Sequence, residues 1–333
     1  MTRLVVIGAG LIGARHIATV RANPECRLVA VVEPDGDRAA RLGVPVYSRI
    51  EDVREAADGA IVASPTPMHP DHVRAAAALG WAVLIEKPAA ASLGEAEALI
   101  ATLQAARVPA LVGYHRRHHR SVAVLRDILA SGRIGRPVLA SLIWAVKKPD
   151  AYFQGNWRSG GGGSPVMINL VHDIDLMRHL FGEVVEVAAL GGAPVRGAAR
   201  MESGAVALSF AGGVSATIAF ADTTPGPWGF EAGTGENPNI ARSGQDMLWI
   251  AGTAGAVSFP SLTVWTGASD WSQAPECQRE SAPDTDPLAA QLRHFLDVIA
   301  GRADPLVDVE DARRTLAVAL RIEADVARAR AAA

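Results

Sequence analysis

Cysteine is scarce in this chain, and no block of charge of one sign occurs. Only Cys26 and Cys277 are found among 333 residues, and no metal-ligand spacing surrounds either of them. A disulfide framework is therefore excluded, and two isolated thiols fit a reducing cytoplasm. The formal net charge is −3, and lysine and arginine do not gather in runs. We therefore expect a cytoplasmic protein that does not bind nucleic acid.

Long apolar runs are also missing. The uncharged stretch Gly204 to Ala221 alternates larger apolar residues with small or polar ones on both sides of Gly212-Gly213. This pattern predicts a hairpin and not a membrane helix. The first expected strand begins at residue 4, which we take to leave no room for a signal peptide. We expect no membrane partner.

A glycine-rich turn directly after a buried strand is the most informative feature. The apolar run at residues 4–7 is followed by Gly8-Ala9-Gly10-Leu11-Ile12-Gly13 and then by a helical pattern. Strand, turn and helix in this order favour a dinucleotide pyrophosphate site over an ordinary glycine turn. Gly8 permits the turn, Gly10 a close approach of the pyrophosphate, and Gly13 close packing of helix and strand. The predicted loop contacts are Gly8, Gly10, Leu11, Ile12 and Gly13.

A carboxylate follows the second expected strand, residues 28–32. Glu33 stands twenty residues after Gly13, where an acid can accept hydrogen bonds from the adenosine ribose. It would also repel the 2′-phosphate of NADP, so we predict NAD as the cofactor, with NADP less favoured. Arg38 counts against the preference for NAD, because it begins a nearby helix and can reach a 2′-phosphate.

The pattern of elements changes near residue 120. Before it, short apolar strands alternate with alanine-rich helices, which predicts a doubly wound parallel sheet. After it, a few helices are mixed with many strands, which predicts an open and mostly antiparallel sheet. We therefore expect an α/β chain with a Rossmann domain at 1–120 and a substrate-binding and oligomerisation domain at 121–333. The helices at 287–299 and 309–329 can pack back on the first domain.

Two further strand ends in the first domain carry polar residues. Ser64-Pro65-Thr66-Pro67 follows the strand at 59–63, and Glu86-Lys87-Pro88 follows the strand at 82–85. Ligands of doubly wound folds bind at the carboxyl ends of the strands, so we predict cofactor contacts from Ser64, Thr66, His69, Glu86 and Lys87. Pro88 restricts the backbone of Lys87, which favours a fixed functional cation over an ordinary surface lysine.

The second domain supplies a candidate general base. His172, Asp175 and His179 are spaced three and four apart on the helix expected at 168–181, so they share a face. His172 has a side chain whose ordinary pKa is near neutral and can accept a proton. Asp175 can orient it or hold a substrate hydroxyl. We expect no metal site here, because no cysteine is near. Three polar residues at a domain interface are the structural alternative.

Together these motifs resemble the Gfo/Idh/MocA oxidoreductase family over essentially the whole chain. The resemblance rests on the phosphate loop, on Glu86-Lys87-Pro88, on the Pro65-Thr66-Pro67 segment with His69 and His72, and on the glycine-rich run that leads into His172 and Asp175. It implies hydride transfer between NAD(P) and a carbinol carbon of a sugar, inositol or related polyol. It also implies a homodimer or homotetramer assembled through the second sheet. Lys87 takes the place of the substrate-contacting lysine, and His172 that of the acid/base histidine.

One position departs from the family pattern. Many of its dehydrogenases carry an aspartate four residues before the histidine, where this chain has Ile168, with Asn169 beside it. An amide can hydrogen-bond a hydroxyl but holds no charge. The departure leaves open an eliminating or hydrolysing enzyme that recycles NAD, or a noncatalytic NAD-dependent binding or sensor protein.

The resemblance places the substrate in a cleft between the domains. We predict that Lys87 hydrogen-bonds the reacting oxygen and that His172 takes the hydroxyl proton. Asn169, Asp175, Arg158, Trp157 and His115 are the predicted substrate contacts. The long segment from Pro225 to Asp246, expected to be irregular, is predicted to border the same cleft.

Overall fold

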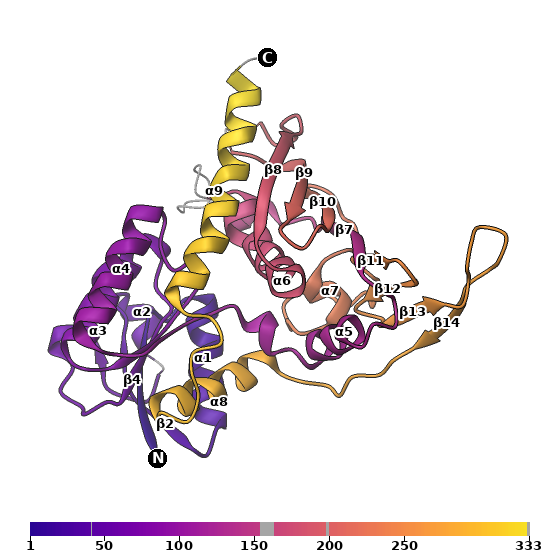
Figure 1. Ribbon diagram of the computed structural model, residues 1–333. Helices are drawn as coiled ribbons and strands as arrows, with labels where there is room; N and C mark the ends of the chain where they lie inside the picture. The colour runs from indigo at the N-terminus through magenta and orange to yellow at the C-terminus, as the bar shows by residue number, and fades with distance from the viewer. Residues whose placement is uncertain (41, 154–162, 198–199, 332–333) are drawn as a thin grey trace. The chain divides into compact units, whose positions relative to one another are not determined.

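The computed structural model describes residues 1–40, 42–153, 163–197 and 200–331 (Figure 1). Two compact units divide the chain. One comprises Met1–His118 and Asp286–Ala317, and the other comprises His119–Thr285 and Val318–Ala333. None of the helices in the described ranges is long and apolar enough to cross a membrane.

The first unit contains a six-stranded parallel sheet. Its strands are β1 (Thr2–Ile7), β2 (Cys26–Val32), β3 (Val46–Tyr47), β4 (Gly59–Val62), β5 (Ala82–Ile85) and β6 (Ala110–Val112). Their order in space is β3-β2-β1-β4-β5-β6, and every neighbouring pair is parallel. Crossovers therefore run in opposite directions from β1 and from β4, so the ends of these two strands form the switch point where such sheets bind ligands.

Helices cover this sheet because each crossover returns the chain along one of its faces. They are α1 (Leu11–Ala22), α2 (Gly36–Ala39), α3 (His69–Ala78) and α4 (Leu93–Ala106), with α8 (Pro287–Ile299) from the C-terminal part. Helix α8 packs against α1. Leu4 and Ile61 from the strands meet Ile17 of α1 and Phe295 of α8 in one buried apolar cluster. Burial of these side chains stabilises the unit by roughly 1.5–3 kcal/mol each.

The second unit contains an eight-stranded sheet of order β14-β13-β12-β11-β7-β10-β9-β8. Its strands are β7 (Pro137–Ala145), β8 (Val184–Gly191), β9 (Ser203–Phe210), β10 (Ser215–Ala221), β11 (Leu248–Gly252), β12 (Gly255–Phe259), β13 (Thr263–Thr266) and β14 (Glu276–Arg279). Every neighbouring pair is antiparallel except β7 and β10. The predicted fold class, a Rossmann domain followed by an open and mostly antiparallel sheet, is confirmed.

One face of the second sheet is packed and the other is open. The helices of this unit are α5 (Arg120–Ala130), α6 (Val171–Phe181), the short α7 (Phe230–Thr234) and the later part of α9 (Val309–Ala331). Leu125 of α5, Ile174 of α6 and Ile322 of α9 share a buried cluster with the inward residues of β9 and β10. On the open face, Leu139 and Leu190 remain exposed.

Three expectations about local structure need correction. Helix α6 begins at Val171, because a π-helical turn, Val166–Leu170, precedes it and the Val171 N–H bonds Val166 O. The segment from Pro225 to Asp246 is not wholly irregular, since α7 lies in it and Phe230 is fully buried. Strand β14 was not expected, because its residues are all exposed and show no apolar alternation.

Candidate active site

The phosphate loop, Gly8–Gly13, joins β1 to α1 at the switch point. Gly8 has φ +96°, and a Cβ there would lie 2.9 Å from the backbone of Ala63 and Ser64 at the end of β4. A Cβ on Gly13 would lie 2.0 Å from Gly8 O, so only glycine fits. A Cβ on Gly10 would meet nothing within 4 Å, which leaves room for a ligand beside the backbone. Gly10 has no side chain to cap α1, so the free N–H groups of its first turn suit a pyrophosphate.

Glu33 braces this loop from the end of β2. Its Oε2 accepts a hydrogen bond from the Ala9 N–H at 2.7 Å, and its Oε1 accepts one from the Asp35 N–H at 3.0 Å. Arg38 Nη1 lies 3.9 Å from Glu33 Oε2, and the arginine side chain is 56% exposed. A carboxylate has about four acceptor positions, so Glu33 keeps capacity for a ribose hydroxyl.

Polar residues at the end of β4 are tied to one another. Ser64 Oγ lies 2.8 Å from His72 Nδ1, and Thr66 begins a short 3-10 helix, Thr66–Met68. His69 is buried, with Nε2 2.8 Å from Ser64 O and Nδ1 3.1 Å from Pro88 O. Burial lowers the pKa of His69, although these carbonyl contacts oppose the shift. His69 therefore links the segment after β4 to the segment after β5.

Glu86 and Lys87 follow β5, and a buried histidine meets the carboxylate. His16 of α1 places Nε2 2.8 Å from Glu86 Oε1, and both side chains are almost fully buried. Burial alone would raise the pKa of Glu86, but the hydrogen bond and charge of His16, with Lys87 and His115, lower it to about 2. Glu86 is thus a buried, ionised carboxylate next to the predicted catalytic lysine. The Lys87–Pro88 peptide bond is cis.

The end of β6 completes this group. Gly113 follows β6, and a Cβ there would lie 3.2 Å from Glu86 Cδ and Oε1. His115, a predicted substrate contact, begins the 3-10 helix His115–His118, is buried, and helps to lower the pKa of Glu86. We call His16, Glu86, Lys87 and Gly113 the lysine site.

His172 and Asp175 lie in the second unit on α6. Their side chains are 5% and 1% exposed, and the three-residue spacing places them on one face of the helix. Asn169 lies in the π-helical turn before α6 and is partly buried. Turns of this kind are rare and often mark functional sites. Ser164, at the start of this segment, hydrogen-bonds Glu323 of α9 and accepts from the Met167 N–H at 3.2 Å.

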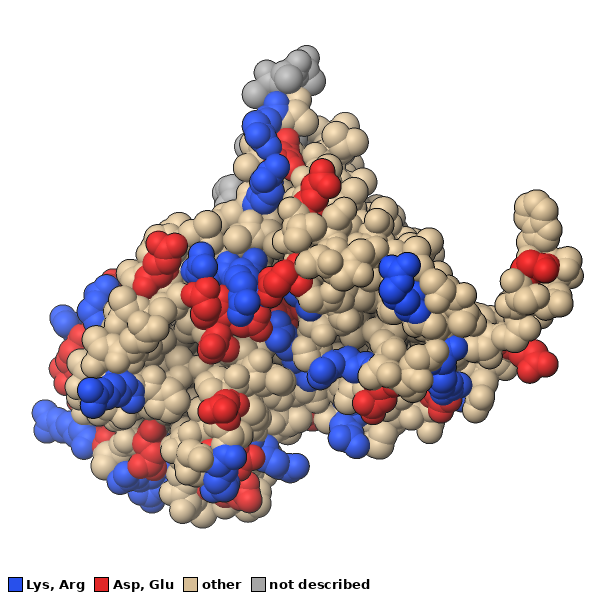
Figure 2. Space-filling model, in the orientation of Figure 1, with Lys and Arg blue, Asp and Glu red and all other residues tan. Residues whose placement is uncertain are grey.

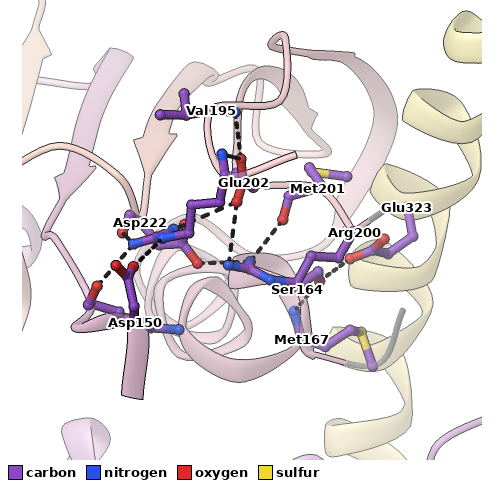
Figure 3. Close-up of polar contacts among 11 residues, drawn as sticks. Asp150, Ser164, Met167, Val195, Arg200, Met201, Glu202, Asp222 and Glu323 are labelled. Atoms are coloured by element: carbon purple, nitrogen blue, oxygen red, sulfur yellow. Dashed lines mark hydrogen bonds and ion pairs between the residues drawn. The ribbon is translucent and has the colours of Figure 1, made fainter. Parts of the chain in front are cut away.

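A second group of charges in this unit, which we call the arginine cluster, comprises the buried Arg200, Glu202 and Asp222 with the partly buried Arg196 and the exposed Asp150 (Figure 3). Arg200 Nη1 donates to Asp222 Oδ2 at 2.8 Å, and Arg196 Nη1 donates to Asp222 Oδ1 at 2.7 Å. Glu202 accepts from the N–H groups of Val195 and Arg196. The cluster joins the start of β9 to the end of β10.

Most predicted site residues fall within the described ranges. The first unit holds the predicted cofactor contacts, with Lys87 and His115, around the ends of β1, β2, β4, β5 and β6. The second unit holds Asn169, His172 and Asp175 on one helical segment. Trp157 and Arg158 lie outside the described residues. In the described ranges, no group of three His, Cys, Asp or Glu side chains could hold a metal ion.

Sequence reasoning missed His16. Its signal was its place in α1, where it shares a buried face with Ile17, Val20 and Gly13. A titratable residue on the apolar face of the helix after a phosphate loop requires a buried partner. The arginine cluster was missed as well, because Asp150 and Asp222 are distant in sequence from the two arginines that they meet, and no local pattern pairs them.

Two family models cover most of the chain. The model described as "Oxidoreductase family, NAD-binding Rossmann fold" matches residues 2–114, and the model described as "GFO/IDH/MocA C-terminal domain" matches residues 122–258. The chain belongs to the Gfo/Idh/MocA oxidoreductase family. The predicted resemblance is confirmed, and with it, at the level of the family, an oxidoreductase with an NAD-binding domain.

Curated relatives agree with this assignment. The 1,5-anhydro-D-fructose reductase of Ensifer adhaerens is 30% identical over 253 residues, which are 70% of this chain and 75% of that protein. An inositol 2-dehydrogenase of Streptomyces avermitilis is 31% identical over 192 residues, 54% of this chain and 53% of that protein. The chain thus spans little more than half the length of several relatives that it matches.

Solved structures share the fold along the whole length. An oxidoreductase from Agrobacterium radiobacter, solved in complex with NAD⁺, L-tartaric acid and magnesium, has a TM-score of 0.82 and 16% identity. The comparison covers 98% of this chain and 97% of that one. At this identity the likeness supports the fold alone.

Proposed function

We propose that this protein is an NAD-dependent oxidoreductase that transfers a hydride between NAD and a carbinol or carbonyl carbon. The substrate class is a sugar, an inositol, or a related polyol or sugar acid. The observation that carries the proposal is a lysine at the end of β5, beside a buried, ionised glutamate, in a chain of this family. A small polar substrate suits the functions named for the relatives.

The phosphate loop suits the cofactor. The open space beside Gly10 and the free N–H groups at the start of α1 would hold a pyrophosphate. Ser64 and Thr66 lie after β4, the neighbour of β1 in the sheet, and are proposed as further contacts. When bound, NAD supplies the hydride acceptor for oxidation of the substrate.

Lys87 and His172 are the proposed catalytic residues. The lysine ammonium donates a hydrogen bond to the reacting oxygen and stabilises the negative charge that develops there. The His172 imidazole accepts the hydroxyl proton during oxidation and returns it during reduction. Asn169 and Asp175 offer an amide and a carboxylate that hydrogen-bond substrate hydroxyls.

Glu33 supports preference for NAD over NADP. Its carboxylate accepts hydrogen bonds from a ribose 2′-hydroxyl and repels a 2′-phosphate. Arg38, half exposed and 3.9 Å from Glu33, is the residue that could offset this repulsion. Calorimetric titration of both cofactors against the wild-type protein and the Arg38→Ala variant tests the assignment. Tighter binding of NADP than of NAD by the wild-type protein would overturn it.

The test of activity is a panel of sugars, inositols, lactones and sugar acids with NAD, followed by absorbance of NADH and by product analysis. Steady formation of NADH supports the dehydrogenase. Product without net NADH supports an enzyme that recycles its cofactor. The sequence favours this second candidate at one position, because the apolar Ile168 stands where many dehydrogenases of the family carry an aspartate. Cofactor binding without any product contradicts both and leaves a binding or sensor protein.

The open face of the second sheet supports a homodimer or homotetramer. Ala205 pairs with Ala219 and Ala207 with Thr217 across β9 and β10, and these small side chains are exposed. Next to them lies an open hollow of about 440 Å³ lined by residues such as Ile143 and Leu190. A face that presents mainly small and apolar side chains suits a second copy of the chain. Light scattering should show an assembly that Ala219→Arg dissociates.

We also propose that the enzyme works in the cytoplasm. Cys26 and Cys277 are both free thiols, and Cys277 is exposed. Such a thiol persists in a reducing compartment. Fractionation of cells that produce the protein tests this, and recovery from an oxidising compartment would contradict it.

A further inference from the structure

We propose that His16 is a positioning residue for Lys87, acting through the carboxylate of Glu86. This inference rests on the proposed function, because it concerns the orientation of the lysine that the proposal places on the reacting oxygen. His16 does not act on the substrate in this assignment. Its role is to connect the helix that follows the phosphate loop to the strand end that carries Lys87.

The contact has a defined direction. His16 Nε2 lies 2.8 Å from Glu86 Oε1, and the two side chains are 2% and 7% exposed. An ionised carboxylate can only accept hydrogen bonds. Nε2 must therefore carry the proton and donate, whether the ring is neutral or charged.

The carboxylate of Glu86 connects three parts of the unit. Oε1 accepts from His16 of α1, and Oε2 accepts from the Lys87 N–H at 3.2 Å. Gly113, after β6, packs against the Glu86 carboxylate, and a Cβ on Gly113 would lie 3.2 Å from Glu86 Oε1. The absence of a side chain at Gly113 therefore makes room for Glu86. The backbone of Lys87 is thus held by a carboxylate that His16 holds in turn.

The phosphate loop lies at the other end of this connection. Gly13, three residues before His16, packs so closely on Gly8 that no Cβ fits between them. A rigid helix start therefore separates the proposed pyrophosphate site from His16 by less than one turn. Without His16, the ionised Glu86 would lose its buried donor and turn toward another one, and the Lys87 backbone would move with it.

The matched variants are His16→Gln and His16→Asn. The Gln amide nitrogen reaches the position of Nε2 and can still donate to Glu86, whereas the Asn amide is too short. Thr19→Ala is the control, because Thr19 lies on α1 and bonds Arg15 O without contacting Glu86. We expect His16→Asn to lower kcat by about ten- to hundredfold, the scale for a misplaced catalytic group. His16→Gln should keep most of the activity, and the Kd for NAD should change by less than about threefold.

A double-mutant cycle separates positioning from general damage. In the Lys87→Met background, His16→Asn should have no further effect on kcat, because the group that it positions is absent. A loss that is equal in both backgrounds would overturn the proposal. An unchanged kcat in His16→Asn, or an equal loss in His16→Gln and His16→Asn, would overturn it too.

A readout without turnover distinguishes failure of this inference from failure of the proposed function. The chain has three lysines, Lys87, Lys147 and Lys148, so acetylation at Lys87 can be measured by peptide mass spectrometry with the exposed Lys147 as reference. The Lys87-to-Lys147 rate ratio should change by at least about threefold in His16→Asn and not in Thr19→Ala, the smallest effect that the positioning argument allows. An unchanged ratio would refute the positioning role even if the parent protein showed no oxidoreductase activity.

Discussion

The lysine site of the first unit and the arginine cluster of the second both bury charge, but they do so differently. At the lysine site, one carboxylate is held by His16 and by the backbone of the residue expected to meet substrate. In the arginine cluster, Asp222 is held by two arginines at once, and Arg200 is 3% exposed. Asp222, a buried carboxylate held by structural partners, serves the fold, whereas Glu86, beside the proposed catalytic lysine, is expected to serve the site as well.

The two groups also differ in reach. Arg196 connects Asp150, the Lys148 carbonyl and Asp222, and the Arg200 guanidinium carbon lies 3.9 Å from the centre of the Phe153 ring. The cluster therefore fixes loops and strand ends of the second unit. Figure 2 shows that acidic and basic side chains on the visible surface are interspersed. Surface pairs of that kind contribute about 0–1 kcal/mol each to stability. The two buried groups are therefore expected to affect stability more than the surface pairs do.

His172→Asn should have the largest effect on turnover. His172 lies in the same unit as the arginine cluster, but it is proposed to act on the substrate and not to stabilise the fold. The change keeps a polar side chain but removes the proton acceptor, so turnover should fall about a hundred- to ten-thousandfold. The low-pH limb of the oxidation profile should flatten, because protonated imidazole cannot accept a proton. Steady-state rates from pH 5 to pH 9 check this.

Asn169→Ala is the matched control for the histidine, since an amide supplies hydrogen bonds and no proton. Its effect should be mild and should fall mainly on KM. Near-normal turnover of His172→Asn with an unchanged pH profile would remove the histidine from its role and leave Lys87 as the acid/base candidate.

Arg200→Met should lower the free energy of unfolding by about 3–5 kcal/mol, because it leaves Asp222 with a buried charge that has lost one partner. Urea unfolding followed by circular dichroism measures the loss. The kcat per folded molecule should stay within about threefold of the wild-type value, because the arginine cluster stabilises the fold and is not proposed to contact the substrate. Full stability with a lost kcat would reverse the comparison between the two groups.

Acid should weaken the lysine site over a defined range. The pKa of Glu86 is lowered from an ordinary value of 4.5 to about 2. The stability that this shift contributes is fully present above the unfolded-state pKa near 4.5 and is lost as pH falls toward about 2. Its size is about 3 kcal/mol.

The measurement is the free energy of unfolding of wild type and Glu86→Gln between pH 7 and pH 2. The difference between them should shrink as pH falls through that range, because the wild-type carboxylate becomes protonated. A difference independent of pH would mean that Glu86 is not ionised in the folded protein.

Lys87→Met should lower turnover by about a hundredfold, the scale for one preorganised donor, and should leave the free energy of unfolding nearly unchanged. NAD affinity should also change little, because the phosphate loop is intact. Activity assays and calorimetric titration measure both quantities. A loss of NAD binding equal to the loss of turnover would make Lys87 a cofactor contact alone.

The sequence by itself determined the strand, turn and helix of the phosphate loop, because glycine spacing and apolar periodicity are local signals. It also placed Glu33, Lys87 and His172 correctly at a strand end or on a helix. The hairpin at Gly204–Ala221 followed from alternation alone, and β9 and β10 confirm it. The roles of these residues in catalysis and cofactor binding stay predictions.

Only the tertiary structure paired His16 with Glu86, seventy residues apart, and gathered the arginine cluster from three stretches of the chain. The physical reason is that a buried charge is satisfied by whichever donor the packing of distant elements brings near, and no sequence period records that choice. The π-helical turn before α6 is a similar case, since the apolar pattern of Val166–Leu170 fits an α-helical turn equally well. Local residue patterns determined the helices and strands of this protein, and the packing of those elements determined which side chains meet.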